Sequence, residues 1–113
     1  MPETAIDKLK RMTAWDADPP LSEGELDGLL ADAARTDAAG LAPLNEEWTP
    51  TYDLNVAASA GWLAKAAKAS GLTEVDPPGS GLFTAKVFDN CCRMARIYAS
   101  KRGLTVRVNR TYT

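Results

Sequence analysis

The sequence predicts an all-α protein: a small bundle of about four helices with a C-terminal extended strand or tail. Alanine, the best helix former, supplies 19 of the 113 residues. Valine and isoleucine together number only seven, too few for a β-sandwich or a long parallel sheet. Apolar residues recur at helical spacing in four segments that prolines and glycines separate. We therefore expect a helical bundle domain over residues 1–103 and an extended arm over residues 104–113.

The first expected helix spans residues 4–13. Ile6, Leu9 and Met12 form a narrow apolar stripe, and Thr4 precedes them as a candidate cap. The sequence ADPP at residues 17–20 ends this segment firmly, because a residue before proline avoids the α conformation.

The second expected helix begins at a capping box, in which Ser22 and Glu25 satisfy each other's backbone amides. We expect it to run to about Ala39, with Gly40 as its C-terminal stop. The loop that follows, residues 41–50, is unusually apolar, which predicts that it packs back onto the bundle. Its apolar residues are Leu41, Leu44 and Trp48.

The third expected helix opens at Thr51, with Asp53 in its first turn, and stops at Gly71. Small residues cover it on more than one side, so we place it at the centre of the bundle. A glycine inside a helix costs about 1 kcal/mol relative to alanine. We therefore expect a neighbour to cross closely at Gly61. The PPGSG sequence at 77–81 predicts an exposed, mobile connection.

The fourth expected helix spans about residues 84–102, and its apolar residues repeat at helical spacing. They are Val87, Phe88, Cys91, Met94, Ala95 and Tyr98. On this pattern Cys91 and Cys92 are small buried or half-buried residues. After Gly103 the apolar period changes from 3.6 to 2, which is typical of a strand over residues 104–112. A lone strand leaves its backbone amides unpaired, so this arm is either disordered when free or paired with another chain.

Charge is divided unevenly along the chain. Residues 1–53 carry twelve acids and four bases, residues 54–85 are balanced, and residues 86–113 carry seven bases and one acid. One acidic and one basic end favour head-to-tail association between copies, which closes into rings or extends into filaments. The alternative is that both sets of charges simply solvate helix faces.

Several functional classes are disfavoured. The chain has no histidine, the commonest general base and metal ligand, and its two cysteines are adjacent. The carboxylate pairs Asp16/Asp18 and Glu46/Glu47 lie in expected loops with nothing nearby to raise their pKa values. We expect no catalysis, no cofactor and no metal. Without a long apolar stretch we also expect a soluble protein with reduced thiols, made in the cytoplasm and not secreted, with no membrane partner.

Two binding functions remain open on the residues alone. A small DNA-binding accessory protein would use the basic final helix and tail for salt-sensitive phosphate contacts. Its candidate residues are Arg93, Arg96, Lys101, Arg102, Arg107 and Arg110. The other is protein recognition by strand addition, with the arm as the added strand, for example in a helical partner-binding module of a bacterial complex.

Three segments in a fixed order resemble the head–tail connector (adaptor, or head-completion) proteins of tailed bacteriophages. They are LSEGELDGLLADAAR at 21–35, TYDLNVAASAGWLAKAAKASG at 51–71 and VFDNCCRMARIYASKRG at 87–103. The order and spacing of the motifs carry the resemblance. The matching residues are Tyr52, Asp53, Leu54, Asn55, Gly61 and Trp62, then Phe88, Asp89, Cys92, Met94, Ala95, Tyr98 and Gly103. The PPGSG connection has no counterpart in the family pattern.

The resemblance implies a structural protein of the virion, assembled in the host cytoplasm. It would form a ring, a dodecamer by resemblance, beneath the portal protein. The ring would extend the channel through which genomic DNA passes without sequence-specific binding, and it would present a platform to the next neck or tail protein.

Two sets of site residues follow as expectations. The portal-binding arm comprises Leu104, Thr105, Val106, Arg107, Val108, Asn109, Arg110, Thr111 and Tyr112. Charge contacts between neighbouring subunits would join acids of the second helix to bases of the fourth. The residues concerned are Glu23, Glu25, Asp27, Asp32, Arg93, Arg96, Lys101 and Arg102.

Overall fold

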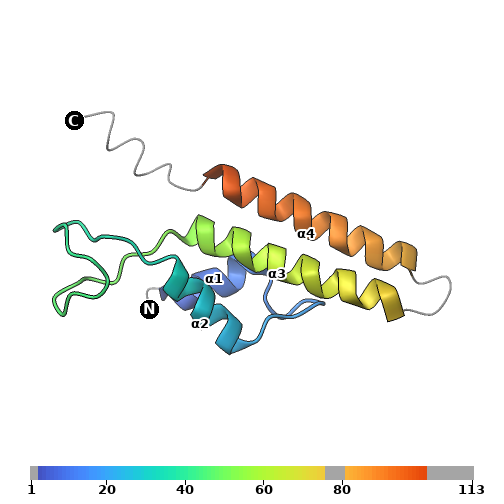
Figure 1. The fold of residues 1–113 in the computed structure, drawn as a ribbon, viewed down its shortest axis with the longest axis horizontal. Coiled ribbons are helices and arrows are strands. Elements are labelled where there is room, and N and C mark those ends of the chain that lie inside the picture. The colour runs from blue at the N-terminus through green and yellow to red at the C-terminus, as the bar shows by residue number, and fades with distance from the viewer. Residues whose placement is uncertain (1–2, 76–80, 102–113) are drawn as a thin grey trace.

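A computed structural model describes residues 3–75 and 81–101, and these form four helices (Figure 1). They are α1 (Ala5–Thr13), α2 (Glu23–Asp32), α3 (Leu54–Val75) and α4 (Gly81–Lys101). The predicted all-α fold is confirmed. The expected strand at 104–112 lies outside the described residues, as does most of the PPGSG connection.

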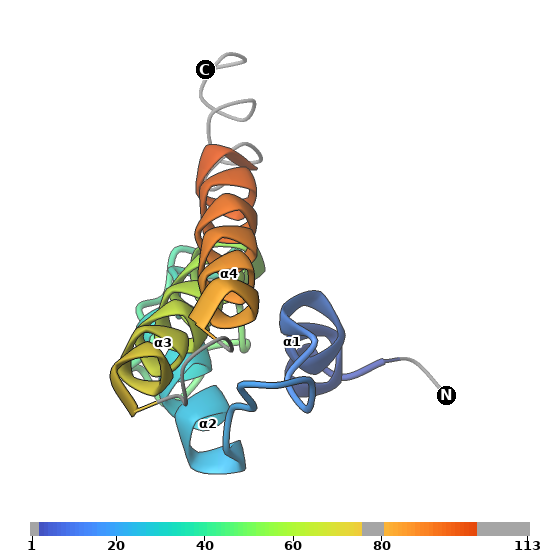
Figure 2. The ribbon, with the colours of Figure 1, turned by 90° about the vertical axis from the view of Figure 1, so that its right-hand side faces the viewer.

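Helix α3 is the centre of the bundle, as predicted. It runs antiparallel to α4, while α1 and α2 pack on its other sides (Figures 1 and 2). Alanines on two faces of α3 allow both contacts. One core lies among α1, α2 and α3, around Leu9, Leu21, Leu26, Ala33, Ala57 and Ala58. The other lies between α3 and α4, around Trp62, Ala66, Cys91 and Ala95.

The predicted N-terminal caps are present. The Thr4 hydroxyl accepts a hydrogen bond from the Asp7 amide at 3.2 Å and begins α1. At α2, the Glu25 amide donates to the Ser22 hydroxyl at 3.1 Å, and the Ser22 amide donates to the Glu25 carboxylate at 2.9 Å. These reciprocal bonds satisfy amides that the first turn of a helix leaves free.

The close crossing at Gly61 is also confirmed. A Cβ atom at this position would lie 2.8 Å from Cγ2 of Thr13 and 3.3 Å from Cδ1 of Leu29. Because Thr13 belongs to α1 and Leu29 to α2, the missing side chain lets both helices approach α3 at one point.

The prediction that the second helix reaches Ala39 is wrong, since α2 ends at Asp32. Beyond it, Ala34 pairs with Tyr52 in an antiparallel bridge, and the Arg35 amide donates to the Thr51 carbonyl at 2.8 Å. These bonds to a distant segment replace the bonds of a further helical turn. Gly40 is not a helix stop but a loop residue with φ of +84°.

The expected ends of the other two long helices also need correction. Helix α3 begins at Leu54, three residues after Thr51, because the Asp53 carboxylate accepts the amides of Asn55 and Val56 and caps the helix there. It continues through Gly71 to Val75, and α4 begins at Gly81 instead of residue 84. A single glycine lowers helix propensity without terminating a helix that packs along a partner.

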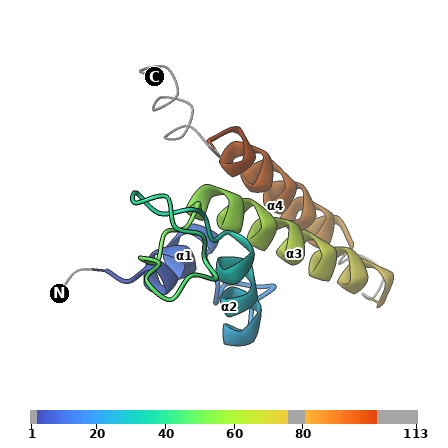
Figure 3. The ribbon, with the colours of Figure 1, turned by 60° about the vertical axis from the view of Figure 1, so that its left-hand side comes forward.

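The loop between α2 and α3, residues 33–53, projects beyond the N-terminal end of α3 (Figures 1 and 3). The prediction that this loop packs back onto the bundle is wrong. Leu41 and Trp48 are half-buried, but neither packs against the two cores, and the Trp48 ring lies edge-on to Tyr52 of the same loop with ring centroids 5.7 Å apart. The prediction fails most clearly for Leu44, because its side chain is 99% exposed. We call residues 33–53 the α2–α3 loop.

Candidate functional site

The acids predicted to contact a neighbouring subunit lie on or beside the outer face of α2. Glu23, Asp27 and Asp32 are exposed, whereas Glu25 is half-buried. Glu25 is already used within the chain, since its carboxylate accepts from Lys68 Nζ at 2.6 Å as well as from the Ser22 amide. The ion pair with Lys68 and the Ser22 amide lower the pKa of Glu25. Glu23 lies 3.4 Å from Lys10, so Asp27 and Asp32 are the acids without an ion-pair partner among the described residues.

The bases predicted for the same contact lie along the exposed face of α4. Arg93, Arg96 and Lys101 are exposed, and Lys86 extends the row toward the start of the helix. A shallow hollow of about 350 Å³ runs along this face between Lys86 and Arg96. Arg93 donates to the Asn90 side chain at 2.8 Å and forms no ion pair within residues 3–75 and 81–101. Arg102 lies outside the described residues.

The acidic helix and the basic helix lie on opposite sides of the molecule. In Figure 2 the bundle is seen end-on, with α4 above α3 and α2 below it. Because α3 separates them, α2 and α4 of one copy do not neutralise each other, and each leaves its charged face available to another molecule. This separation was not evident from the sequence. The sequence shows that the two sets of charges are far apart along the chain, but it does not show where they lie in space.

A second hollow, of about 360 Å³, lies where residues 14–18 meet α3 and α4. We call it the junction pocket. Its lining is mainly apolar and comprises Ala14, Ala17, Trp62, Val87 and Cys91. Four polar residues complete it, namely Asp18, Lys65, Lys86 and Asn90. Lys86 and Asn90 also line the hollow on α4, so the pocket and the basic row form one continuous surface.

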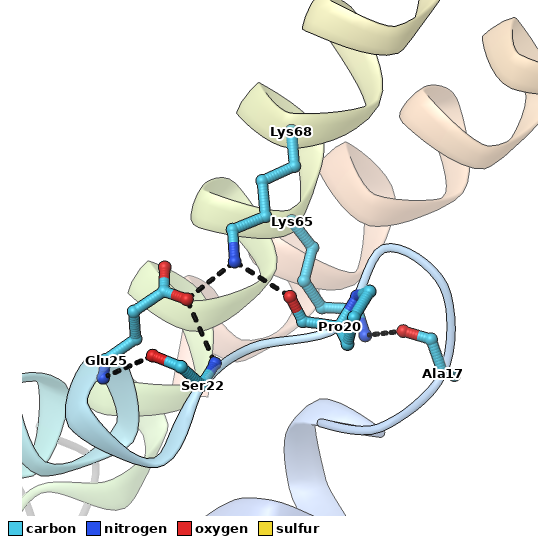
Figure 4. Close-up of polar contacts among 6 residues, drawn as sticks. All are labelled: Ala17, Pro20, Ser22, Glu25, Lys65 and Lys68. Atoms are coloured by element: carbon cyan, nitrogen blue, oxygen red, sulfur yellow. Dashed lines mark hydrogen bonds and ion pairs between the residues drawn. The ribbon is translucent and has the colours of Figure 1, made fainter.

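Lys65 lines the junction pocket and joins α3 to residues 14–17, and Figure 4 shows its bond to Ala17. Only 1% of this lysine is exposed, and its ammonium group donates to the carbonyl oxygens of Ala14 at 2.7 Å and Ala17 at 2.9 Å. It also lies 5.2 Å from the centre of the Trp62 ring. Burial away from water lowers the pKa of Lys65. One turn further along α3, Lys68 donates to the Pro20 carbonyl at 2.8 Å.

In the sequence, Lys65 is one of two bases that two acids balance within residues 54–85, and it was not predicted to be buried. A signal for its burial was present, because Ala58, Trp62, Lys65 and Ala69 share one helical row and the other three are apolar. All four are buried in the structure. Cys91 behaves as predicted: it is buried, and burial raises the pKa of its thiol. An activated nucleophile needs the opposite shift.

The α2–α3 loop is organised around Asp37, a residue that the sequence analysis missed. One carboxylate oxygen accepts the amides of Ala39 at 3.0 Å and Leu41 at 2.9 Å, and the other accepts the Thr49 amide at 2.8 Å. These backbone bonds, that of Thr49 above all, lower the pKa of Asp37. A further hydrogen bond across the loop comes from Trp48, whose indole N–H donates to the Arg35 carbonyl at 2.8 Å.

Comparison with protein-family models, with curated proteins and with solved structures finds no match to this chain. Within residues 3–75 and 81–101, no helix has the length and apolar character needed to cross a membrane. In the same part of the chain, no three side chains of the types His, Cys, Asp and Glu converge to hold a metal ion. The structure offers three candidate surfaces: the acidic face of α2, the basic face of α4 with the junction pocket, and the α2–α3 loop.

Proposed function

We propose that this chain is a structural head–tail connector of a tailed bacteriophage, which forms a ring under the portal protein and extends the DNA channel toward the neck. One observation carries the proposal: the acidic α2 and the basic α4 lie on opposite sides of α3 (Figure 2). A molecule with complementary charge on two opposite sides attracts copies of itself head to tail, and closure of such contacts makes a ring.

The free charges suit this arrangement. Asp27 and Asp32 on one side, and Arg96 on the other, form no ion pair among the described residues. In the proposed ring, the α2 acids of one copy contact the α4 bases of the next. The arm at residues 104–112 then attaches the ring to the portal by adding a strand to it.

Co-sedimentation with portal rings from the same genome tests this function. Three chains are compared: the full chain, a chain ending at Gly103, and a full-length chain whose residues 104–112 are replaced by Gly and Ser. We expect stoichiometric binding by the full chain alone, with unchanged helical circular dichroism in all three. Binding by the chain that ends at Gly103 would show that the arm is not the anchor. No binding by any chain would count against the connector function.

The DNA-binding alternative is supported by the same exposed row on α4. It predicts affinity for duplex DNA that falls steeply with salt, and a loss of affinity in the double variant Arg93→Glu/Arg96→Glu. We favour the connector because it uses both charged faces, whereas DNA would contact only the basic face of α4 and be repelled by the acidic face of α2. Salt-sensitive DNA binding by the full chain without portal binding would reverse this preference.

A further inference from the structure

The tip of the α2–α3 loop presents an exposed apolar side chain beside two acids. Leu44 is 99% exposed, and Glu46 and Glu47 follow it on the same exposed turn. An isolated exposed leucine is common on protein surfaces and needs no explanation by itself. Leu44 differs because the loop that carries it is held in one conformation by an extensive set of hydrogen bonds.

Those hydrogen bonds act at both ends of the loop and within it. Asp37, which is 7% exposed, accepts three backbone amides, and the Trp48 indole donates to the Arg35 carbonyl. Closer to the tip, the Asn45 amide donates to the Ala42 carbonyl at 2.9 Å, and the Trp48 amide donates to the Asn45 carbonyl at 3.0 Å. A loop ordered before binding loses little conformational entropy on binding, so it is well suited to insert its tip into a partner.

The junction pocket has the chemistry that such a tip requires. Trp62, Val87 and the two alanines give it an apolar lining. Two exposed charges line it as well, the positive Lys86 on α4 and the negative Asp18, so incoming acids are favoured only on the Lys86 side. Its volume is about 360 Å³. A dry cavity of roughly 150 Å³ already accepts a benzene molecule, so one leucine side chain fits easily. Leu44 matches the apolar lining, and Glu46 and Glu47 match Lys86.

The loop and the pocket of one molecule do not meet. The loop projects from the start of α3, away from the helix (Figures 1 and 3). Trp62 and Lys65 lie eight and eleven residues into α3 from Leu54, which is about 12 and 16 Å along the helix in the other direction. A Leu44 side chain that enters this pocket must therefore come from a second molecule.

We propose that Leu44 of one copy inserts into the junction pocket of the next copy, with Glu46 and Glu47 beside Lys86. The loop follows directly from the acidic α2, and the pocket is continuous with the basic row of α4. The two halves of the contact thus extend the two charged faces already described. This inference rests on the proposed function for its setting, since it names the contact between neighbours in the ring. We call the Leu44 side chain the knob. Because the knob and the junction pocket are different surfaces of the molecule, the contact is heterologous.

Two full-length variants separate the two halves of the contact. Leu44→Ala removes the knob and keeps the pocket, whereas Ala17→Phe keeps the knob and obstructs the pocket from an exposed position. Leu63→Ala is the matched control, because Leu63 is another exposed leucine, 55% accessible, that lines neither surface. Self-association is measured by sedimentation velocity from roughly 10 µM to 1 mM protein, a range that detects contacts with millimolar Kd.

We expect the wild-type chain and the Leu63→Ala variant to associate alike, and each pocket or knob variant to associate at least about tenfold more weakly. An equimolar mixture of Leu44→Ala and Ala17→Phe should form dimers and nothing larger, because it contains one intact knob and one intact pocket per pair. A wild-type chain that stays monomeric to 1 mM, equal weakening by Leu63→Ala, or a mixture that stays monomeric would each overturn the inference.

Portal co-sedimentation of the same variants distinguishes this inference from the proposed function. If the Leu44→Ala chain is monomeric and still binds portal through the arm, the result supports both the Leu44 contact and the connector function. If the variants show the expected pattern of self-association but no chain binds portal, the contact stands and the connector function fails. If portal binds but the mixture forms no dimers, the connector function stands and the contact fails.

Discussion

The ammonium nitrogen of Lys65 lies 2.7 Å from the carbonyl oxygen of Ala14, the C-cap residue that directly follows α1. Ala14 adopts a left-handed conformation with φ of 45°, and the last carbonyls of a helix have no helical donor. Lys65 supplies the missing donor from α3, and a cation at this end of a helix is favoured by the helix dipole. A buried lysine thus joins the end of α1 to the centre of the bundle and shapes one wall of the junction pocket.

Replacing Lys65 by methionine should lower the free energy of unfolding by about 1–3 kcal/mol, because the carbonyl oxygens of half-buried Ala14 and exposed Ala17 lose a charged donor. Lys68→Met is the matched control one turn away. Its side chain is 37% exposed, so its pair with Glu25 should contribute about 1 kcal/mol or less. Urea unfolding at pH 7 measures both variants. Equal losses in the two would contradict the role assigned to Lys65.

Gly61→Ala should destabilise the protein by about 1–3 kcal/mol, although alanine is the better helix former, because its Cβ would overlap Thr13 at 2.8 Å. Gly28→Ala on α2 is the control, since nothing lies within 4 Å of a Cβ there. That change should stabilise the protein by about 0.5–1 kcal/mol. Thermal or urea unfolding checks the pair, and a stabilised Gly61→Ala chain would mean that α1 and α2 do not cross α3 at this point.

Asp37→Asn should loosen the α2–α3 loop, because an amide NH₂ group would face a backbone N–H that the carboxylate now accepts. The wild-type chain should therefore be the more stable of the two at neutral pH, with slower hydrogen exchange at the Leu41 and Thr49 amides. Asp32→Asn, at an exposed acid with no ion pair among the described residues, should change exchange at these amides little.

The advantage of Asp37 over asparagine also depends on pH with a definite sign. The folded-state pKa of Asp37 is lowered from its ordinary value of 3.8, so the unfolded chain binds the proton first as the pH falls. The stabilisation is fully present above the unfolded pKa and is lost as the pH falls through the folded pKa. Unfolding of both chains over this acidic range should show the difference shrinking. If the difference in unfolding free energy between the two chains stayed constant, the charge of Asp37 would not be what stabilises the loop.

Cys91 should resist alkylation in the folded chain. Only 1% of the residue is exposed, and burial raises the pKa of the thiol, which reduces the reactive thiolate. Cys92, its half-buried neighbour, provides the internal comparison. Mass spectrometry after iodoacetamide treatment at pH 8 should find Cys91 modified only when urea is present, and Cys92 modified first. Labelling of Cys91 at the same rate with and without urea would mean that the α3–α4 core is open.

The features that the sequence predicted correctly depend on neighbours in the chain. The Ser22–Glu25 capping box and the Thr4 cap are bonds over three residues, so their residue types identify them directly. The core face of α4, with Cys91 and Ala95 at its centre, follows from helical periodicity alone. Gly61 was identifiable because a glycine within an alanine-rich helix has a cost that close packing can offset.

The features that the sequence did not reveal depend on residues far apart in the chain. Helix α2 stops at Asp32 because the backbone near Ala34 pairs with Tyr52, and no pattern in residues 33–39 encodes a partner so distant. Leu44 is apolar, so the sequence predicted that it packs on the bundle, but it is exposed at the tip of a loop in which Asp37 accepts the Leu41 amide and the more distant Thr49 amide. The sequence by itself determined the helices, their caps and the uneven charge. Only the tertiary structure decided that α3 separates acid from base, that Lys65 is buried and that the loop tip is exposed, because each requires contacts that form only when distant helices pack.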